Sequence, residues 1–244
     1  MLLLCAVSLS AFAQNQPNST LYQVNVLKPK AGMKNAFEES WKTHLTKFHG
    51  KNDKRTVFEV TSGSDDGAYV IVEGPFSYTD MDKDKPMSKE HDADLDKNLD
   101  PKLEPKTSNG LFRWVDTLSL NPQVQAQKFL VSVTRVKNGK MAEYLAEQKR
   151  TVMILQNLKT PISLNALVKQ QAGSEPTLVT IRNLKDGFKE LEDNYLQMAP
   201  NAFRDEYVKT YGQDAWDKRV KLLVDDVESR EQHFEKLRTD LSSK

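Results

Sequence analysis

Two stretches of this chain repeat one design, and the repeat limits what the chain can fold into. The stretches are "LYQVNVLKPKAGMKNAFEESWK" at residues 21–42 and "KFLVSVTRVKNGKMAEYLAEQK" at residues 128–149. They align without a gap at a constant offset of 107 residues, which is the separation of Gly32 and Gly139. This offset far exceeds the period of a solenoid repeat, so we interpret it as the duplication of a whole small domain.

Each repeat is predicted to run strand, helix, hairpin, helix, strand. Residues 21–28 alternate as a strand does, and residues 33–49 carry apolar side chains at the three-and-four spacing of an amphipathic helix. The hairpin "RTVFEVTSG" and "AYVIVEG" follows, then a polar stretch with helical sections, then the strand "GLFRWVDTLSL". The second repeat has the same order, except that residues 228–241 fit a strand by symmetry and a helix by propensity. We leave that choice open.

This order predicts the fold class. A β-α-β-β-α-β unit forms a four-stranded antiparallel sheet with both helices on one face. Two such units can bury their bare faces against each other. We therefore expect an α+β fold of two ferredoxin-like repeats, residues 21–122 and 128–244, whose antiparallel sheets pack face to face as an intrachain α/β barrel.

The element order, the duplication and the segment "VNVLKPKAGMKNAFEESWK" resemble the dimeric α/β-barrel superfamily in its tandem, pseudo-dimeric form. Members include antibiotic-biosynthesis-monooxygenase-like, NIPSNAP-like and chlorite-dismutase-like proteins. The resemblance covers about residues 21–241 and brings no diagnostic active-site motif. It implies a barrel that hosts small molecules, and in some members cofactor-independent oxygenation or a histidine-held haem.

The first residues have the pattern of a signal peptide. "MLLLCAVSLSAFAQ" is an apolar run that ends in Ala11-Phe12-Ala13, the small-x-small pattern read by signal peptidase. We expect cleavage after residue 13, a disordered linker over 14–20, and export to the periplasm or the medium. The run lacks a basic start, so whether translation begins upstream is left open. Cleavage removes Cys5, which is the only cysteine. The exported protein can therefore form neither disulfides nor a cysteine-ligated zinc site.

The overall charge limits the classes of binding partner that the chain can attract. The chain has 35 basic and 34 acidic residues, so it offers no net field to attract nucleic acid or an anionic membrane. No apolar run after the signal is long enough to cross a bilayer. The oligomeric state is not predicted. The remaining candidates are a small apolar or aromatic ligand and a protein partner.

Trp41 and His44 are the strongest candidates for chemistry. They are three residues apart on the first predicted helix and so lie side by side. At the same offset the second repeat has Gln148 and Thr151. The apolar positions of the helix are therefore duplicated, whereas this pair is not. An indole beside an imidazole can hold an aromatic ligand and move a proton. The structural alternative is a half-buried histidine at the edge of the core, whose ring forms a hydrogen bond with a neighbouring group.

Related cofactor-independent monooxygenases place Asn, Trp, His, Tyr and Arg around an aromatic substrate. By that resemblance His44 is the candidate catalytic residue, with Asn25, Trp41, Tyr69 and Trp114 as ligand-binding residues. Asn25 and its counterpart Ser132 are polar positions on otherwise apolar strands, which suits either a ligand pocket or a barrel interior with buried water.

We expect no cofactor and no metal site. Haem is kept as a lesser option that would need His44, His49, His91 or His233, and the chain has no c-type attachment motif. The segment "DMDKDKPMSKEHDADLD" fails as a calcium loop and is interpreted as solvated acidic and basic side chains. No phosphate loop, G-x-S-x-G elbow or H-E-x-x-H pair occurs.

The leading hypothesis is an exported α/β-barrel protein that binds a small apolar or aromatic molecule, with oxygenase-like activity as an option. The alternative is a non-enzymatic envelope protein whose barrel is filled by side chains and whose surface binds a protein partner. Fold alone does not choose between them, and whether the chain is an enzyme stays open. An open cavity beside Trp41 and His44 would favour the first.

Overall fold

The computed structural model describes residues 20–49, 54–83, 88–105, 108–170 and 175–243. The predicted signal peptide and the predicted linker, apart from Thr20, lie outside the described residues. The first repeat contains β1 (Leu21–Leu27), α1 (Lys34–Phe48), β2 (Arg55–Val60), β3 (Tyr69–Phe76), α2 (Tyr78–Met81), α3 (Lys89–Asp94) and β4 (Ser108–Trp114). The second contains β5 (Lys128–Val136), α4 (Met141–Asn157), β6 (Ser163–Lys169), β7 (Thr177–Leu184), α5 (Ala202–Tyr211), α6 (Gln213–Asp225) and β8 (Val227–Leu237).

The duplication is confirmed. β1 and α1 begin 107 residues before β5 and α4, the offset found in the sequence. The turn between strand and helix needs a glycine in both repeats, because Gly32 and Gly139 have φ angles of 76° and 81°. Phe37 and Tyr144, which align in the repeat, are both buried. Each helix therefore lies on its sheet through an aromatic ring at the same position.

The predicted fold class is also confirmed. Hydrogen-bonded strands follow the order β1-β3-β2-β8-β5-β7-β6-β4, and the order closes because β1 also pairs with β4. The protein is α+β, with tandem ferredoxin-like repeats whose strands form a closed eight-stranded antiparallel barrel. Residues 227–237 form β8, so the strand alternative for the last segment is correct. Strand pairing with β2 outweighs the helical propensity of the segment.

Contacts within the chain define two compact units. The first unit comprises the residues up to Arg113 together with His233–Lys244, and the second comprises Trp114–Gln232. β8 therefore starts in the second unit and ends in the first. The C-terminal residues after β8 pack on α1 of the first unit.

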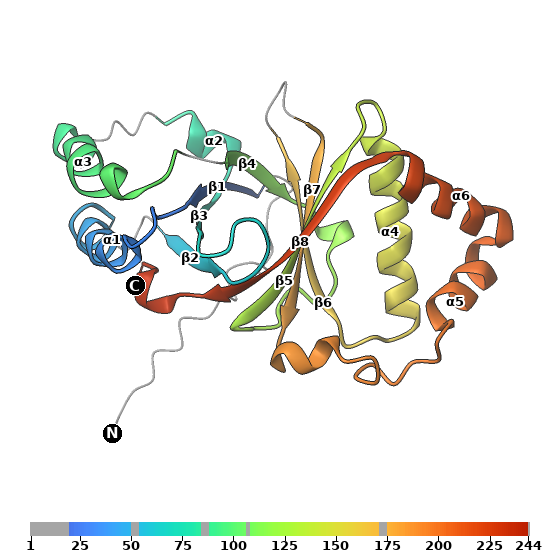
Figure 1. Ribbon diagram of the computed structural model, residues 1–244. Helices are drawn as coiled ribbons and strands as arrows, with labels where there is room; N and C mark the ends of the chain where they lie inside the picture. Colours follow the sequence, from blue (N-terminus) through green and yellow to red (C-terminus); the bar gives the residue numbers. More distant parts are fainter. Residues whose placement is uncertain (1–19, 50–53, 84–87, 106–107, 171–174, 244) are drawn as a thin grey trace. The chain divides into compact units, whose positions relative to one another are not determined.

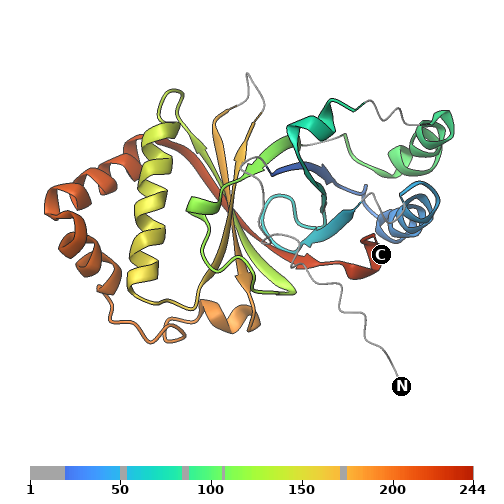
Figure 2. The same cartoon turned by 180° about the vertical axis from the view of Figure 1, so that it is seen from behind.

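Each unit has its own apolar core between helix and sheet. In the first unit Phe37, Trp41 and Leu45 of α1 pack on Val57, Tyr69 and Ile71 of the sheet, with Leu99 and Leu241 closing the cluster. In the second unit Tyr144 of α4 packs on Ala166, Val168 and Leu178, with Leu118 and Val136. Figures 1 and 2 show α4 lying between the strands of its unit and the outer helices α5 and α6. Within the described residues, none of the helices combines the length and apolarity needed to cross a bilayer.

Candidate metal centre and adjoining cavity

Three histidines come together in the first unit. His44 lies on α1, His49 directly follows that helix, and His91 lies in the first turn of α3. Their ring centroids are 4.8–5.3 Å apart, and one ring nitrogen of each lies within 4.8 Å of the others. All three side chains are buried, with residue exposures of 1%, 5% and 6%. We call these residues the histidine cluster.

Local structure explains how His91 reaches this position. Ser88 caps α3, because its hydroxyl accepts a hydrogen bond from the backbone N–H of His91 at 3.1 Å. A π-helical segment, Leu95–Leu99, continues α3, and its Leu95 and Leu99 contact the core under α1. The α3 region is thereby held against α1, with His91 facing His44.

Hydrogen bonds orient two of the rings. Nδ1 of His44 lies 2.7 Å from Oδ2 of Asp94, and Nδ1 of His91 lies 3.2 Å from Oδ1 of Asp92. A carboxylate accepts only from a protonated nitrogen, so these contacts place the N–H on Nδ1 and the lone pair on Nε2. Nε2 of His44 is 3.1 Å from Nε2 of His49, whereas Nε2 of His91 is buried without a hydrogen-bond partner.

Burial favours neutral imidazole at His44. Desolvation lowers the pKa of His44 below its ordinary value, and the charge of His91 lowers it further, although Asp94 opposes both effects. The pKa of Asp94 is lowered, first by its hydrogen bond to His44 and then by that from Asn98. The pair is therefore a neutral imidazole that donates to an ionised carboxylate.

A cavity of about 670 Å³ adjoins the cluster. Its lining is mainly apolar, and His44 and His91 form part of its wall. Asn25 and Trp41 also line it, so three of the predicted site residues share one cavity. The full set is Asn25, Leu27, Lys30, Trp41, His44, Arg55, Ile71, His91, Leu95, Leu99, Asp100, Leu103, Glu104 and Pro105.

Asn25 resolves a choice that the sequence left open. It lines the cavity together with Leu27 of the same strand and with residues of α1, so this strand face is turned toward the helices. The counterpart Ser132 accepts a hydrogen bond from Nε2 of Gln232 at 2.7 Å. The two equivalent polar positions therefore have different surroundings, a cavity in one repeat and a strand neighbour in the other.

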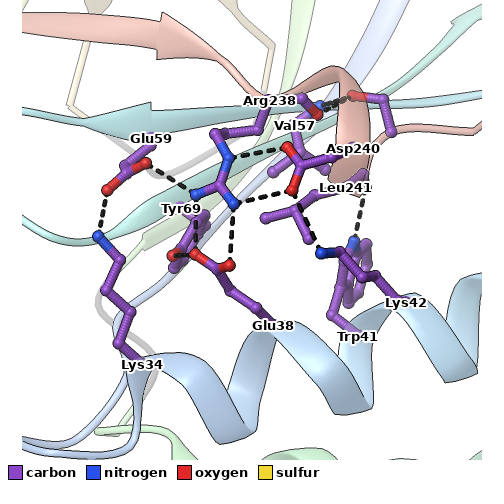
Figure 3. Close-up of polar contacts among 11 residues, drawn as sticks. Lys34, Glu38, Trp41, Lys42, Val57, Glu59, Tyr69, Arg238, Asp240 and Leu241 are labelled. Carbon is purple, nitrogen blue, oxygen red and sulfur yellow. Dashed lines mark hydrogen bonds and ion pairs between the residues drawn. The ribbon is translucent and has the colours of Figure 1, made fainter.

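Trp41 lines the cavity, and Figure 3 shows its contact with Leu241 among the C-terminal residues. The indole N–H donates to the backbone carbonyl of Leu241 at 2.8 Å. Arg238, just after β8, donates to Glu38 on α1 and to Glu59 on β2 at 2.7–2.9 Å, and it also pairs with Asp240. This network joins α1, β2 and the residues after β8.

Two of the predicted site residues, Tyr69 and Trp114, are not among the described residues that line the cavity. The Tyr69 ring packs 5.1 Å from Phe37, and its hydroxyl donates to Glu38 of the same network (Figure 3). Burial and the Glu38 carboxylate raise the pKa of Tyr69. Trp114 ends β4 and belongs to the second unit.

Sequence reasoning did not group His49 and His91 with His44. The sequence pattern places His91 in a segment of solvated acidic and basic side chains. This interpretation is wrong for His91 and Leu95, which are turned toward α1 and its core. A usable signal was the apolar spacing of Leu95 and Leu99 after His91, which predicts one buried face for this segment.

The second repeat fills the same helix position with a structural cluster. Thr151, the counterpart of His44, accepts a hydrogen bond from Arg219 at 2.8 Å. Arg219 also pairs with the buried carboxylate of Glu147, which accepts from the Tyr207 hydroxyl at 2.7 Å. These contacts tie α4 to α5 and α6. The fold therefore does not require a histidine at this point.

Comparison with known proteins supports the fold. No protein-family model matches the sequence, and a search of curated proteins finds no match. Among solved structures, an anthrone oxidase-like protein has a TM-score of 0.54 at 13% identity, covering 90% of this chain and 92% of its own. A candidate monooxygenase from Fusobacterium nucleatum has a TM-score of 0.53 at 14% identity, covering 91% and 94%. A mutant chlorite dismutase from Candidatus Nitrospira defluvii has 0.52 at 7% identity, covering 91% and 93%.

These likenesses define the class of fold. The chain has the dimeric α/β-barrel fold in its tandem form, as the resemblance in the sequence implied. At 14% identity or less they show the fold alone, and the chemistry has to be argued from the residues of this chain.

The expectation of no cofactor is corrected by the same comparison. A mutant chlorite dismutase shares the fold, and chlorite-dismutase-like proteins belong to the group for which the sequence resemblance implied a histidine-held haem in some members. The donors in this chain fit coordination chemistry, because a buried imidazole nitrogen without a partner lies at the wall of a cavity. One such nitrogen would suit haem iron. Three converging imidazoles are a more specific arrangement, because they can bind one metal ion directly.

Proposed function

We propose that this protein binds a small apolar or aromatic molecule in the cavity beside Trp41 and His44. The observation that carries the proposal is the cavity itself, whose volume of about 670 Å³ lies within the usual range for ligand sites. Its wall combines the Trp41 indole and leucine side chains with polar and charged groups, among them Asn25 and His44. Such a wall buries an apolar ligand and orients it by a small number of hydrogen bonds.

The cavity also bears on the alternative, a barrel filled by side chains that binds a protein partner. An open volume next to the unduplicated Trp41 and His44 is expected of a ligand-binding protein, and the cavity lies there. It supports the ligand-binding function. Export also remains part of the proposal, and its support is the apolar run ending in Ala11-Phe12-Ala13.

Blocking the cavity tests the binding function. Leu103 lines the cavity and is partly exposed, so Leu103→Trp should fill the space without disturbing the buried core. A fluorescent aromatic probe such as anilinonaphthalene sulfonate should bind the wild type, and Leu103→Trp should weaken that binding at least tenfold. Leu222→Trp is the matched control, because Leu222 lines a groove of the second unit. Equal binding by both variants would place the ligand elsewhere.

Oxygenase-like activity is the finer part of the proposal. The likeness to an anthrone oxidase-like protein and a candidate monooxygenase supports it, and the histidine cluster supplies groups that can move a proton. The test is oxygen consumption with an anthrone such as dithranol. His44→Gln and Leu103→Trp should both reduce the rate at least tenfold. If the rate is unchanged in both, the protein is a binding protein only.

A further inference from the structure

We propose that His44, His49 and His91 form a binding site for a divalent transition-metal ion. The ring nitrogens converge without cysteine or carboxylate ligands, and imidazole donors suit zinc, copper, nickel or iron rather than calcium or magnesium. Zinc is the probe for which the geometry can be checked. The site shares His44 and His91 with the wall of the cavity described above, whereas His49 is not among the described residues that line it.

The distances suit a metal ion. Zinc binds histidine nitrogen at about 2.0–2.1 Å, so two nitrogens on a tetrahedral ion are about 3.3 Å apart. Nε2 of His44 and Nε2 of His49 are 3.1 Å apart, and the third nitrogen lies within 4.8 Å. Small rotations of the rings would bring all three to one ion.

The lone pairs of His44 and His91 are also placed for coordination, whereas Nε2 of His49 donates to Nε2 of His44 and gives up that proton when it binds a metal. Asp94 and Asp92 hold the N–H of His44 and of His91 on Nδ1, which leaves Nε2 of each ring as an acceptor. The carboxylate behind His44 is the arrangement that fixes the tautomer and orientation of metal-bound histidine in other proteins. Among the described residues, Nε2 of His91 is buried without a hydrogen-bond partner, so this atom is available to a ligand.

The cluster is not a requirement of the fold. The second repeat uses Thr151, Glu147 and Arg219 at the corresponding helix, and the one histidine among its described residues, His233, lies on β8 and pairs with Glu235. Three buried imidazoles in one repeat therefore call for a local reason. His44 and His91 also line the cavity, so a fourth coordination position would open toward the ligand, a point that rests on the proposed function.

Metal titration of the full chain tests the site. Protein stripped with a chelator should take up one zinc ion per chain in calorimetry, and zinc should raise the melting temperature. His91→Ala should weaken zinc binding at least 100-fold. His233→Ala is the matched control, because His233 is the only other histidine and pairs with Glu235. It should bind zinc as the wild type does.

Two further measurements keep the result interpretable. Cobalt should give visible d–d absorption in the wild type and in His233→Ala, and none in His91→Ala. Circular dichroism of the stripped variants checks that His91→Ala is folded. If it is not, Asp94→Asn serves instead, with an expected tenfold loss of affinity for zinc.

Zinc binding that is unchanged in folded His91→Ala, or absent from the wild type, overturns the proposal. So does a Soret band in protein from its own host that is lost in His91→Ala, which would assign these histidines to haem. Loss of zinc binding with probe binding intact in His49→Ala, a histidine that is not among the described residues lining the cavity, separates this site from the cavity.

Discussion

Trp41 donates its indole N–H to the backbone carbonyl of Leu241 at 2.8 Å, across 200 positions of the sequence. The bond is buried and joins α1 to the residues after β8. It explains why an indole, rather than any large apolar side chain, suits this position. The same ring forms part of the cavity wall.

Trp41→Phe should lower the free energy of unfolding by about 1–3 kcal/mol, because the carbonyl of Leu241 loses its donor in a buried place. Trp114→Phe is the control, since the Trp114 indole nitrogen is buried without a hydrogen-bond partner. It should cost no hydrogen bond. Urea denaturation of both variants checks the difference, and equal losses would show that the bond to Leu241 contributes nothing.

Phe37→Ala should destabilise the protein by about 3–5 kcal/mol, because a large buried ring is removed from the core under α1. Phe37 is 1% exposed and packs against Tyr69. Val224→Ala, at a residue that is 72% exposed, should change stability by less than about 0.5 kcal/mol. A loss below about 1 kcal/mol for Phe37→Ala in chemical denaturation would remove Phe37 from the core.

Arg238→Met should lower stability by about 1.5–3 kcal/mol at neutral pH, because the partly buried carboxylates of Glu38 and Glu59 lose their hydrogen bonds to the guanidinium. Arg135→Met is the control, since Arg135 pairs with exposed Glu175 and Glu231. It should cost less than about 1 kcal/mol. Similar losses for both would show that the network around Arg238 contributes no more to stability than an exposed ion pair does.

The same arginine predicts a pH dependence. Hydrogen bonds from Arg238 lower the pKa of Glu38 below its ordinary value of 4.5 and that of Asp240 to about 2. Because these pKa values are lower in the folded state, the stabilisation is complete above the ordinary values and is lost as the pH falls toward 2. Unfolding curves between pH 7 and pH 2 should therefore show a steeper loss for the wild type than for Arg238→Met. Parallel curves would contradict this.

Tyr207→Phe tests the structural cluster of the second repeat. The Tyr207 hydroxyl donates to the buried Glu147 carboxylate, and its removal should cost about 1.5–3 kcal/mol. Tyr211→Phe removes an exposed hydroxyl that contacts the Met153 sulfur and should be nearly neutral. Thermal unfolding measures both. If Tyr207→Phe is also neutral, Arg219 and Arg150 satisfy Glu147 without the hydroxyl.

The fold was predictable from sequence because its signals are local and repeated. Alternation at β1 and β5, the glycine turns and the apolar spacing of α1 and α4 all occur twice at one offset. β8 was ambiguous, because its local propensity favours a helix and only pairing with β2 decides for a strand. Such pairing depends on residues far apart in the chain.

The site was predictable only in part. Trp41 and His44 were found because the second repeat lacks them, and Asn25 because it is polar on an apolar strand. His91 joins them through the Ser88 cap and the packing of Leu95 and Leu99, which position the α3 region on α1. In the sequence that region is dominated by charged residues, so its buried face was hidden by the charges around it.

The path of β8 has a consequence for biosynthesis. The first unit needs residues from His233 onward, yet 119 residues of the second unit, Trp114–Gln232, are translated before them. At about 5–20 residues per second the ribosome needs roughly 6–24 s for that interval. During this time α1 lacks its C-terminal partners, Trp41 has no acceptor in Leu241, and Glu38 has no arginine. The second unit can pack as it emerges, whereas the unit that carries the histidines is completed last, although most of it is made first.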